Sequence, residues 1–127
     1  MWFNRHILLY FTSPEDLDFH ETVHAQRYDA KSSWVVDRIH RRVEWALSET
    51  YVSHVNAGAV RVRRGEEMMP ANIVAATPVQ GQEGDWNCQK FILEGLRGIV
   101  SHGLQTNEWY NFMEGQITEC LIDGAVP

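Results

Sequence analysis

The hydrophobic pattern of this sequence changes once, near Asp85, and that change constrains the fold more than any other feature. Beyond Asp85, apolar residues recur with the period of an amphipathic helix. We predict a helix whose start is capped by Asp85 or Asn87 and whose end is marked by Gly103 in the left-handed conformation. Its apolar stripe consists of Phe91, Ile92, Leu93, Leu96, Ile99 and Val100.

The remaining segments complete a mixed pattern of strands and helices. A second long helix is expected over residues 107–122, ended by Gly124. A helix is expected within residues 66–75, and Pro70 limits it either to two short pieces or to a late start. Residues 5–62 favour strands, because β-branched and aromatic residues gather in short runs between turn signals. These runs are residues 6–11, 34–39, 51–55 and 59–62.

We therefore expect one α+β domain over residues 1–127, with a mostly antiparallel sheet in its N-terminal two-thirds packed against two C-terminal helices. The formal net charge of −6 argues against a general nucleic-acid binder, because phosphate binding requires an excess of Lys and Arg. We interpret the arginines between Arg38 and Arg64 as a solvated face of the sheet. No stretch approaches the roughly 18 consecutive apolar residues that span a bilayer, so no membrane span is expected.

The two cysteines, Cys88 and Cys120, are too few for the disulfide framework of a small secreted domain. With no leader-like segment at the start, we expect a cytoplasmic protein with reduced thiols. Cys88 falls in the first turn of the predicted helix, where unpaired amides and the helix dipole stabilise a thiolate and can hold an oxyanion. Its neighbours Asn87 and Gln89 are candidates for binding the oxyanion or the substrate. The alternative is that Cys88 is a small buried hydrophobic residue, as most unpaired cysteines are.

Three segments of the sequence resemble a known superfamily. The run Asn-Cys-Gln-Lys-Phe at residues 87–91 resembles the Asn-Cys-x-x-Phe motif of permuted NlpC/P60-type papain-like proteins, which include lecithin retinol acyltransferase-like and PPPDE-type thiol enzymes. Residues 5–11, in which a His precedes apolar residues, are similar to the first strand of these proteins. Residues 19–23 are similar to the next strand, which carries a second His in the acyltransferase members. Small fungal proteins also carry similar Trp-Asn-Cys-Gln-x-Phe runs.

The resemblance implies a permuted papain-like domain with Cys88 as nucleophile, His6 as its base and His20 as the residue that orients the base. Nucleophilic catalysis by a thiol requires the same three groups, since the thiol needs a base and the base needs an orienting group on its other ring nitrogen. On a strand, His20 and His24 share one face, so either residue can orient His6. The expected reaction is acyl transfer through a covalent thioester, on a peptide or small molecule, without cofactor or metal. The oligomeric state is left open.

Two other functions are compatible with the sequence. Residues 20–24 match the HExxH motif of zinc metallopeptidases, in which a helix brings His20 and His24 to one ion, and Glu44 would be a third ligand. The apolar residues of segment 19–25 alternate, however, as in a strand, so we expect no zinc. The remaining alternative is a non-catalytic protein-interaction module on the same fold.

Overall fold

The computed structural model describes residues 6–27, 29, 31–47, 55–81 and 86–125, with side chains through residue 119. Its architecture is α+β, as predicted. A three-stranded antiparallel sheet lies in the N-terminal part, and two of the three helices are C-terminal. The elements are β1 (Leu9–Thr12), β2 (His20–Gln26), β3 (Val35–Ile39), the 3-10 turn η1 (Trp45–Leu47), α1 (Met69–Ala75), α2 (Cys88–Ser101) and α3 (Asn107–Ala125).

Strand β2 lies at the centre of the sheet and has two different faces. It pairs with β1 so that Val23 lies opposite Leu9, and with β3 so that His24 lies opposite Asp37. Because side chains alternate along a strand, Val23 and Ala25 share one face and His24 belongs to the other. Both apolar residues are fully buried in the core. The other face is covered in part by η1, where Trp45 Nε1 donates a hydrogen bond to Thr22 Oγ1 at 3.0 Å.

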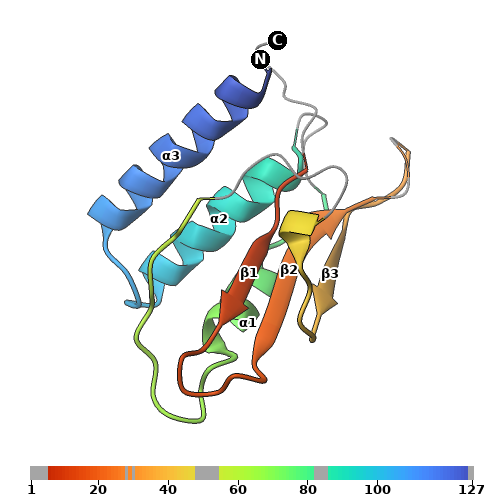
Figure 1. Ribbon diagram of the computed structural model, residues 1–127. Helices are drawn as coiled ribbons and strands as arrows, with labels where there is room; N and C mark the ends of the chain where they lie inside the picture. Colours follow the sequence, from red (N-terminus) through yellow and green to blue (C-terminus); the bar gives the residue numbers. More distant parts are fainter. Residues whose placement is uncertain (1–5, 28, 30, 48–54, 82–85, 126–127) are drawn as a thin grey trace.

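The helices form two further layers on the apolar face of the sheet. Helices α1 and α2 pack against β2 and against each other, and α3 packs against α2 as the outermost layer (Figure 1). Gly95 allows the close approach of α1 and α2, since a Cβ at this position would lie 2.7 Å from Val74 Cγ1. The core formed by these layers includes Val23, Ala25, Ala71, Val74, Trp86, Phe91, Ile92, Leu96, Ile99, Tyr110, Met113 and Ile117.

Local signals set the boundaries of α2 and α1 as the sequence predicts. The Asn87 side chain caps α2 by accepting hydrogen bonds from the backbone amides of Gln89 and Lys90, at 3.0 and 3.1 Å. Gly103 follows α2 with a φ of 77°, the left-handed conformation expected for a helix stop. Helix α1 begins only at Met69, because Pro70 is acceptable in the first turn of a helix but not farther inside.

The sheet is smaller than the sequence predicts. Residues 59–62 were expected to form a strand, but the structure gives them no regular secondary structure. Their segment lies beside α3, where Trp109 Nε1 donates to the Ala57 carbonyl and Gln105 Nε2 to the Ala59 carbonyl. Side chains thus satisfy carbonyls that a neighbouring strand would otherwise bond, and β-prone residues form a strand only where such a neighbour exists. The predicted strand at 51–55 lies almost wholly outside the described residues.

Two element ends also differ from prediction. Strand β1 begins at Leu9, so His6 precedes it. Helix α3 continues through Gly124 to Ala125 instead of ending at the glycine. Within the part of the chain that the structure describes, no helix has the length and hydrophobicity to cross a membrane.

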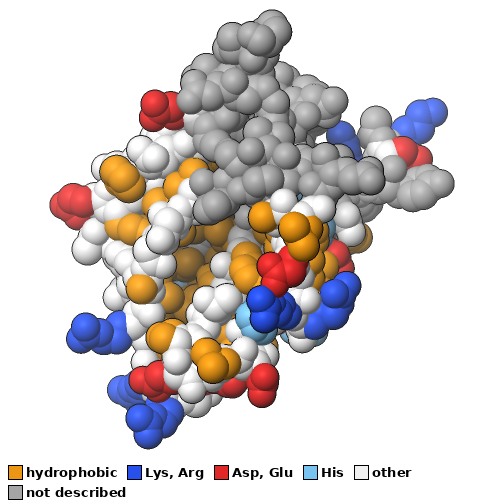
Figure 2. Space-filling view, in the orientation of Figure 1, with side chains coloured by type: hydrophobic (Ala, Val, Ile, Leu, Met, Phe, Trp, Pro, Cys, Tyr) orange, Lys and Arg blue, Asp and Glu red, His pale blue; other side chains and the backbone are white. Residues whose placement is uncertain are grey.

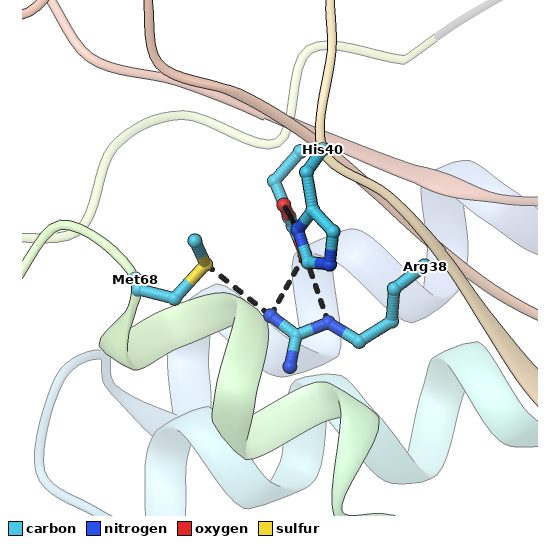
Figure 3. A network of polar contacts seen from close by, with 4 residues as sticks. Arg38, His40 and Met68 are labelled. Atoms are coloured by element: carbon cyan, nitrogen blue, oxygen red, sulfur yellow. Dashed lines mark hydrogen bonds and ion pairs between the residues drawn. The ribbon is translucent and has the colours of Figure 1, made fainter.

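A buried carboxylate, that of Glu21, bonds to two basic side chains on the helix-facing side of the sheet. Arg38 bonds to Glu21 Oε1, with Nε at 2.8 Å and Nη2 at 2.7 Å, and His40 Nδ1 lies 2.5 Å from Oε2. Arg38 also extends over α1 to the sulfur of Met68, at 3.2 Å (Figure 3). The sequence predicted that Arg38 belongs to a solvated basic face. The structure corrects this prediction, because Arg38 pairs with a buried carboxylate. The other charges visible on the face in Figure 2 are interspersed, with Asp and Glu beside Lys and Arg.

Candidate active site

Cys88 is the first residue of α2, and its side chain contacts the backbone of Ile7 in the segment that leads into β1. The backbone amides of Ile7, Cys88 and Gln89 all face its sulfur. The Ile7 amide belongs to the peptide bond between His6 and Ile7. The structure therefore brings the backbone of the predicted base next to the predicted nucleophile, although these residues are far apart in the sequence.

The side chain of Cys88 is in a more apolar environment than its helix position suggests. Cys88 is only 8% exposed. Burial raises the pKa of its thiol above the ordinary value, and the three surrounding amides oppose this effect without reversing it. The position of Cys88 at a helix start predicts a stabilised thiolate, but it does not account for burial. In the structure the resting group is a neutral thiol, and its activation depends on a base.

His6 is bonded to a second imidazole. Its Nε2 lies 2.6 Å from Nδ1 of His24, and the two rings meet edge to face with centroids 4.8 Å apart. Partial burial lowers the pKa of His6 below its usual value, and the neighbouring His24 lowers it further. His6 is therefore a neutral imidazole at pH 7, the form that can accept a proton. Its hydrogen bond to Cys88 stays a prediction.

His24 continues the arrangement to a carboxylate on the next strand. Its Nε2 lies 2.8 Å from Oδ2 of Asp37, the residue directly opposite it in the pairing of β2 with β3. The His24 side chain is only 8% exposed, whereas Asp37 is 39% exposed. A buried imidazole held on both nitrogens has a fixed orientation. The His6, His24 and Asp37 side chains thus form one series of contacts, and Cys88 adjoins it through the backbone amide that follows His6.

His20 does not take part in this group, which corrects the expectation that it orients the base. It pairs with Thr12, at the opposite end of β1 from His6. At about 3.4 Å per residue, the six positions between His6 and Thr12 span about 20 Å. His20 Nδ1 instead lies 2.6 Å from the Tyr10 hydroxyl, and its Nε2 lies 3.0 Å from the Leu17 carbonyl oxygen. The contact predicted for His20 or His24 is made by His24.

Asn87 and Gln89, the expected oxyanion or substrate residues, flank the sulfur. The Asn87 side-chain oxygen serves as the cap of α2, so only its amide nitrogen remains as a donor for a ligand. Gln89 is 8% exposed and contributes its backbone amide to the surroundings of the sulfur. Because the Gln89 amide also donates to the Asn87 cap, the backbone amides of Ile7 and Cys88 are the better candidates for binding an oxyanion.

The HExxH motif has the wrong backbone for a zinc peptidase. His20 and His24 lie on strand β2, as the alternation of residues predicts, and not one turn apart on a helix. The carboxylate of Glu21 bonds to Arg38 and His40, while Glu44 pairs with Arg42. Among the residues that the structure describes, no three His, Cys, Asp or Glu side chains are grouped as metal ligands.

Two hollows on the described surface lie away from this site. One, of about 260 Å³, is lined by residues of α2 and by Tyr110 of α3. The other, of about 570 Å³, is lined by α1, the residues before it and His102. Both are shallow and neither contains Cys88 or His6. We identify the candidate site from the Cys88 thiol, the amides that face it and the linked histidines that begin at the adjacent His6–Ile7 peptide, because an open hollow without such groups has no chemistry of its own.

Asp37 is the member of the site that the sequence argument missed. The two strand-forming runs indicate an antiparallel pair, but only the observed register of residues 22–26 with 35–39 places Asp37 opposite His24. Without that register, the sequence does not show which of its acidic residues contacts His24.

No protein-family model matches the sequence, and no curated protein or solved structure is significantly similar to the chain. The resemblance to permuted papain-like proteins therefore stays a prediction from three short segments.

Proposed function

We propose that the protein is a cysteine-dependent hydrolase or acyltransferase that acts on an amide, peptide or (thio)ester through a covalent thioester. One observation carries the proposal: the Cys88 sulfur lies against the His6–Ile7 peptide while the His6 ring is bonded to His24. Nucleophilic catalysis by a thiol needs a neutral imidazole within its reach and a group that holds this imidazole, and we propose that His6 and His24 fill these two roles. The sequence resemblance supports the same assignment.

The proposed mechanism begins with transfer of the thiol proton to His6 as Cys88 attacks the substrate carbonyl. The tetrahedral oxyanion is stabilised by the backbone amides of Cys88 and Ile7. His6 then protonates the leaving amine or alcohol, and the carbonyl re-forms as a thioester on Cys88. Water or an amine attacks this thioester, gives its proton to His6, and releases the acyl group with recovery of the thiol. Since the thiol must stay reduced, we place the activity in a reducing compartment such as the cytoplasm.

A non-catalytic binding module is the second candidate, and one observation favours it. Cys88 is almost fully buried and its thiol pKa is raised, as in a structural cysteine. In this interpretation the polar group around His24 stabilises the sheet end and performs no chemistry.

Acylation by a generic acyl donor distinguishes the two candidates. The native protein is incubated with p-nitrophenyl acetate, and intact-protein and peptide mass spectrometry locate any acetyl group. We expect rapid acetylation of Cys88 in the wild type and in Cys120→Ser, and none in Cys88→Ala. His6→Gln should reduce the rate by about 100-fold, the usual contribution of a general base. Equal acetylation of the wild type and His6→Gln, or none in the wild type, would leave the binding module as the function.

A further inference from the structure

We infer that Asp37 is a positioning residue that fixes the tautomers of both histidines, so that His6 presents an unprotonated Nδ1 as the basic nitrogen. The inference deepens the proposed function and rests on it for the role of His6. It is carried by two consecutive contacts, His6 Nε2 to His24 Nδ1 at 2.6 Å and His24 Nε2 to Asp37 Oδ2 at 2.8 Å.

The first step starts from the carboxylate. An ionised carboxylate only accepts hydrogen bonds, so the nitrogen that contacts Asp37 must carry a proton. His24 is therefore protonated on Nε2. When His24 is neutral, only one of its nitrogens carries a proton, and its Nδ1 is then an acceptor.

The second step passes this constraint to His6. Because His24 Nδ1 is an acceptor, the 2.6 Å contact requires that His6 Nε2 donate. A neutral His6 then has no proton on Nδ1. Nδ1 is the nitrogen directed away from His24 and is the one that can receive a thiol proton.

Packing makes the arrangement specific. The strand register places Asp37 directly opposite His24, and the buried His24 ring cannot turn to exchange its nitrogens without breaking both contacts. If the acceptor on β3 were replaced by a donor, the proton on each of the two imidazole rings, His24 and His6, would move from Nε2 to Nδ1. His6 would then carry its proton on Nδ1 and could not act as a base there.

Asp37→Asn tests this inference, because an amide can present its NH₂ group to His24 in nearly the same space. Asp37→Glu is the matched variant that keeps an acceptor. Two-bond ¹H–¹⁵N spectra of the ¹⁵N-labelled full chain at neutral pH report the protonated nitrogen of each imidazole, with assignments from His6→Gln and His24→Gln. We expect Nε2–H on both rings in the wild type and in Asp37→Glu, and Nδ1–H in Asp37→Asn. Acetylation of Cys88 should fall by about 100-fold in Asp37→Asn and recover largely in Asp37→Glu.

The outcomes separate this inference from the proposed function. Nδ1–H on His6 in the wild type, or unchanged tautomers in a folded Asp37→Asn, would overturn the positioning role whatever the activity. If Asp37→Asn does not fold, the wild-type and Asp37→Glu spectra still decide the matter. Expected tautomers together with no acetylation of wild-type Cys88 would retain the role of Asp37 in holding the imidazoles and reject the enzyme.

Discussion

Arg38 and Glu21 form an ion pair across the sheet, with Nη2 2.7 Å from Oε1, although the Glu21 side chain is completely buried. Removing one member of such a pair leaves the other charge without compensation in a poorly solvated place. We expect Arg38→Ala, which leaves the fully buried Glu21 carboxylate without its arginine, to lower the free energy of unfolding by about 3–5 kcal/mol, measured by urea denaturation. Glu44→Ala removes the exposed pair with Arg42 and is the control, with a loss of about 0–1 kcal/mol. Similar losses in both variants would contradict the assignment.

The contact of α1 with α2 predicts opposite effects at two glycines. A Cβ at Gly95 would lie 2.7 Å from Val74 Cγ1, whereas nothing lies within 4 Å of a Cβ at Gly115 in α3. Gly95→Ala should therefore lower the free energy of unfolding by about 1–3 kcal/mol through overpacking. Gly115→Ala should raise it by about 0.5–1 kcal/mol, because alanine is the better helix former. Thermal unfolding of the two variants checks the difference, and a stabilised Gly95→Ala would show that the layers are farther apart.

The buried thiol predicts a particular pH dependence of alkylation. Burial raises the pKa of Cys88 above its ordinary value of 9.0, and only the thiolate reacts with iodoacetamide. In Cys120→Ser, which keeps a single thiol, the rate should increase about tenfold per pH unit from pH 6 to pH 9. Mass spectrometry of timed samples measures the rate, and guanidinium-unfolded protein serves as the reference. A rate that is already constant at pH 6–7 would indicate a resting thiolate.

The lowered pKa of His6 predicts loss of stability in acid. The unfolded chain binds a proton at His6 near pH 6.5, while the folded chain resists protonation to lower pH because of burial and of His24. The unfolded state therefore binds more protons between these two pKa values, and the free energy of unfolding falls as pH decreases through that window. Denaturation between pH 8 and pH 5 should show a smaller decrease for His6→Gln than for the wild type. Parallel curves would mean that His6 titrates alike in both states.

Elements with strong local signals were predictable from the sequence, and contacts set by tertiary packing were not. Asn87 specifies the start of α2 by bonding two nearby amides, and Pro70 delays α1 through its own ring. Residues 59–62 have the composition of a strand, but their neighbours in space are side chains of the α3 region. No local property of that segment indicates this environment.

The same distinction applies to the candidate site. Cys88 and His6 were selected because their residue types and positions suit the chemistry. The choice between His20 and His24 and the presence of Asp37 depend on the register of two strand pairs. A shift of one residue in either register would change which side chains meet. The raised pKa of Cys88 similarly depends on burial by residues distant in the sequence.

The order of the site residues along the chain has a consequence for synthesis. The segments that carry His6, His24 and Asp37 leave the ribosome well before α2, which carries Cys88. A nascent chain can pair its strands early, yet it contains no nucleophile until the last helices emerge and dock. Any acyl transfer would thus begin only after the tertiary structure is complete. A C-terminally truncated translation product that lacks α2 also lacks Cys88, and it would have no acyl-transfer activity.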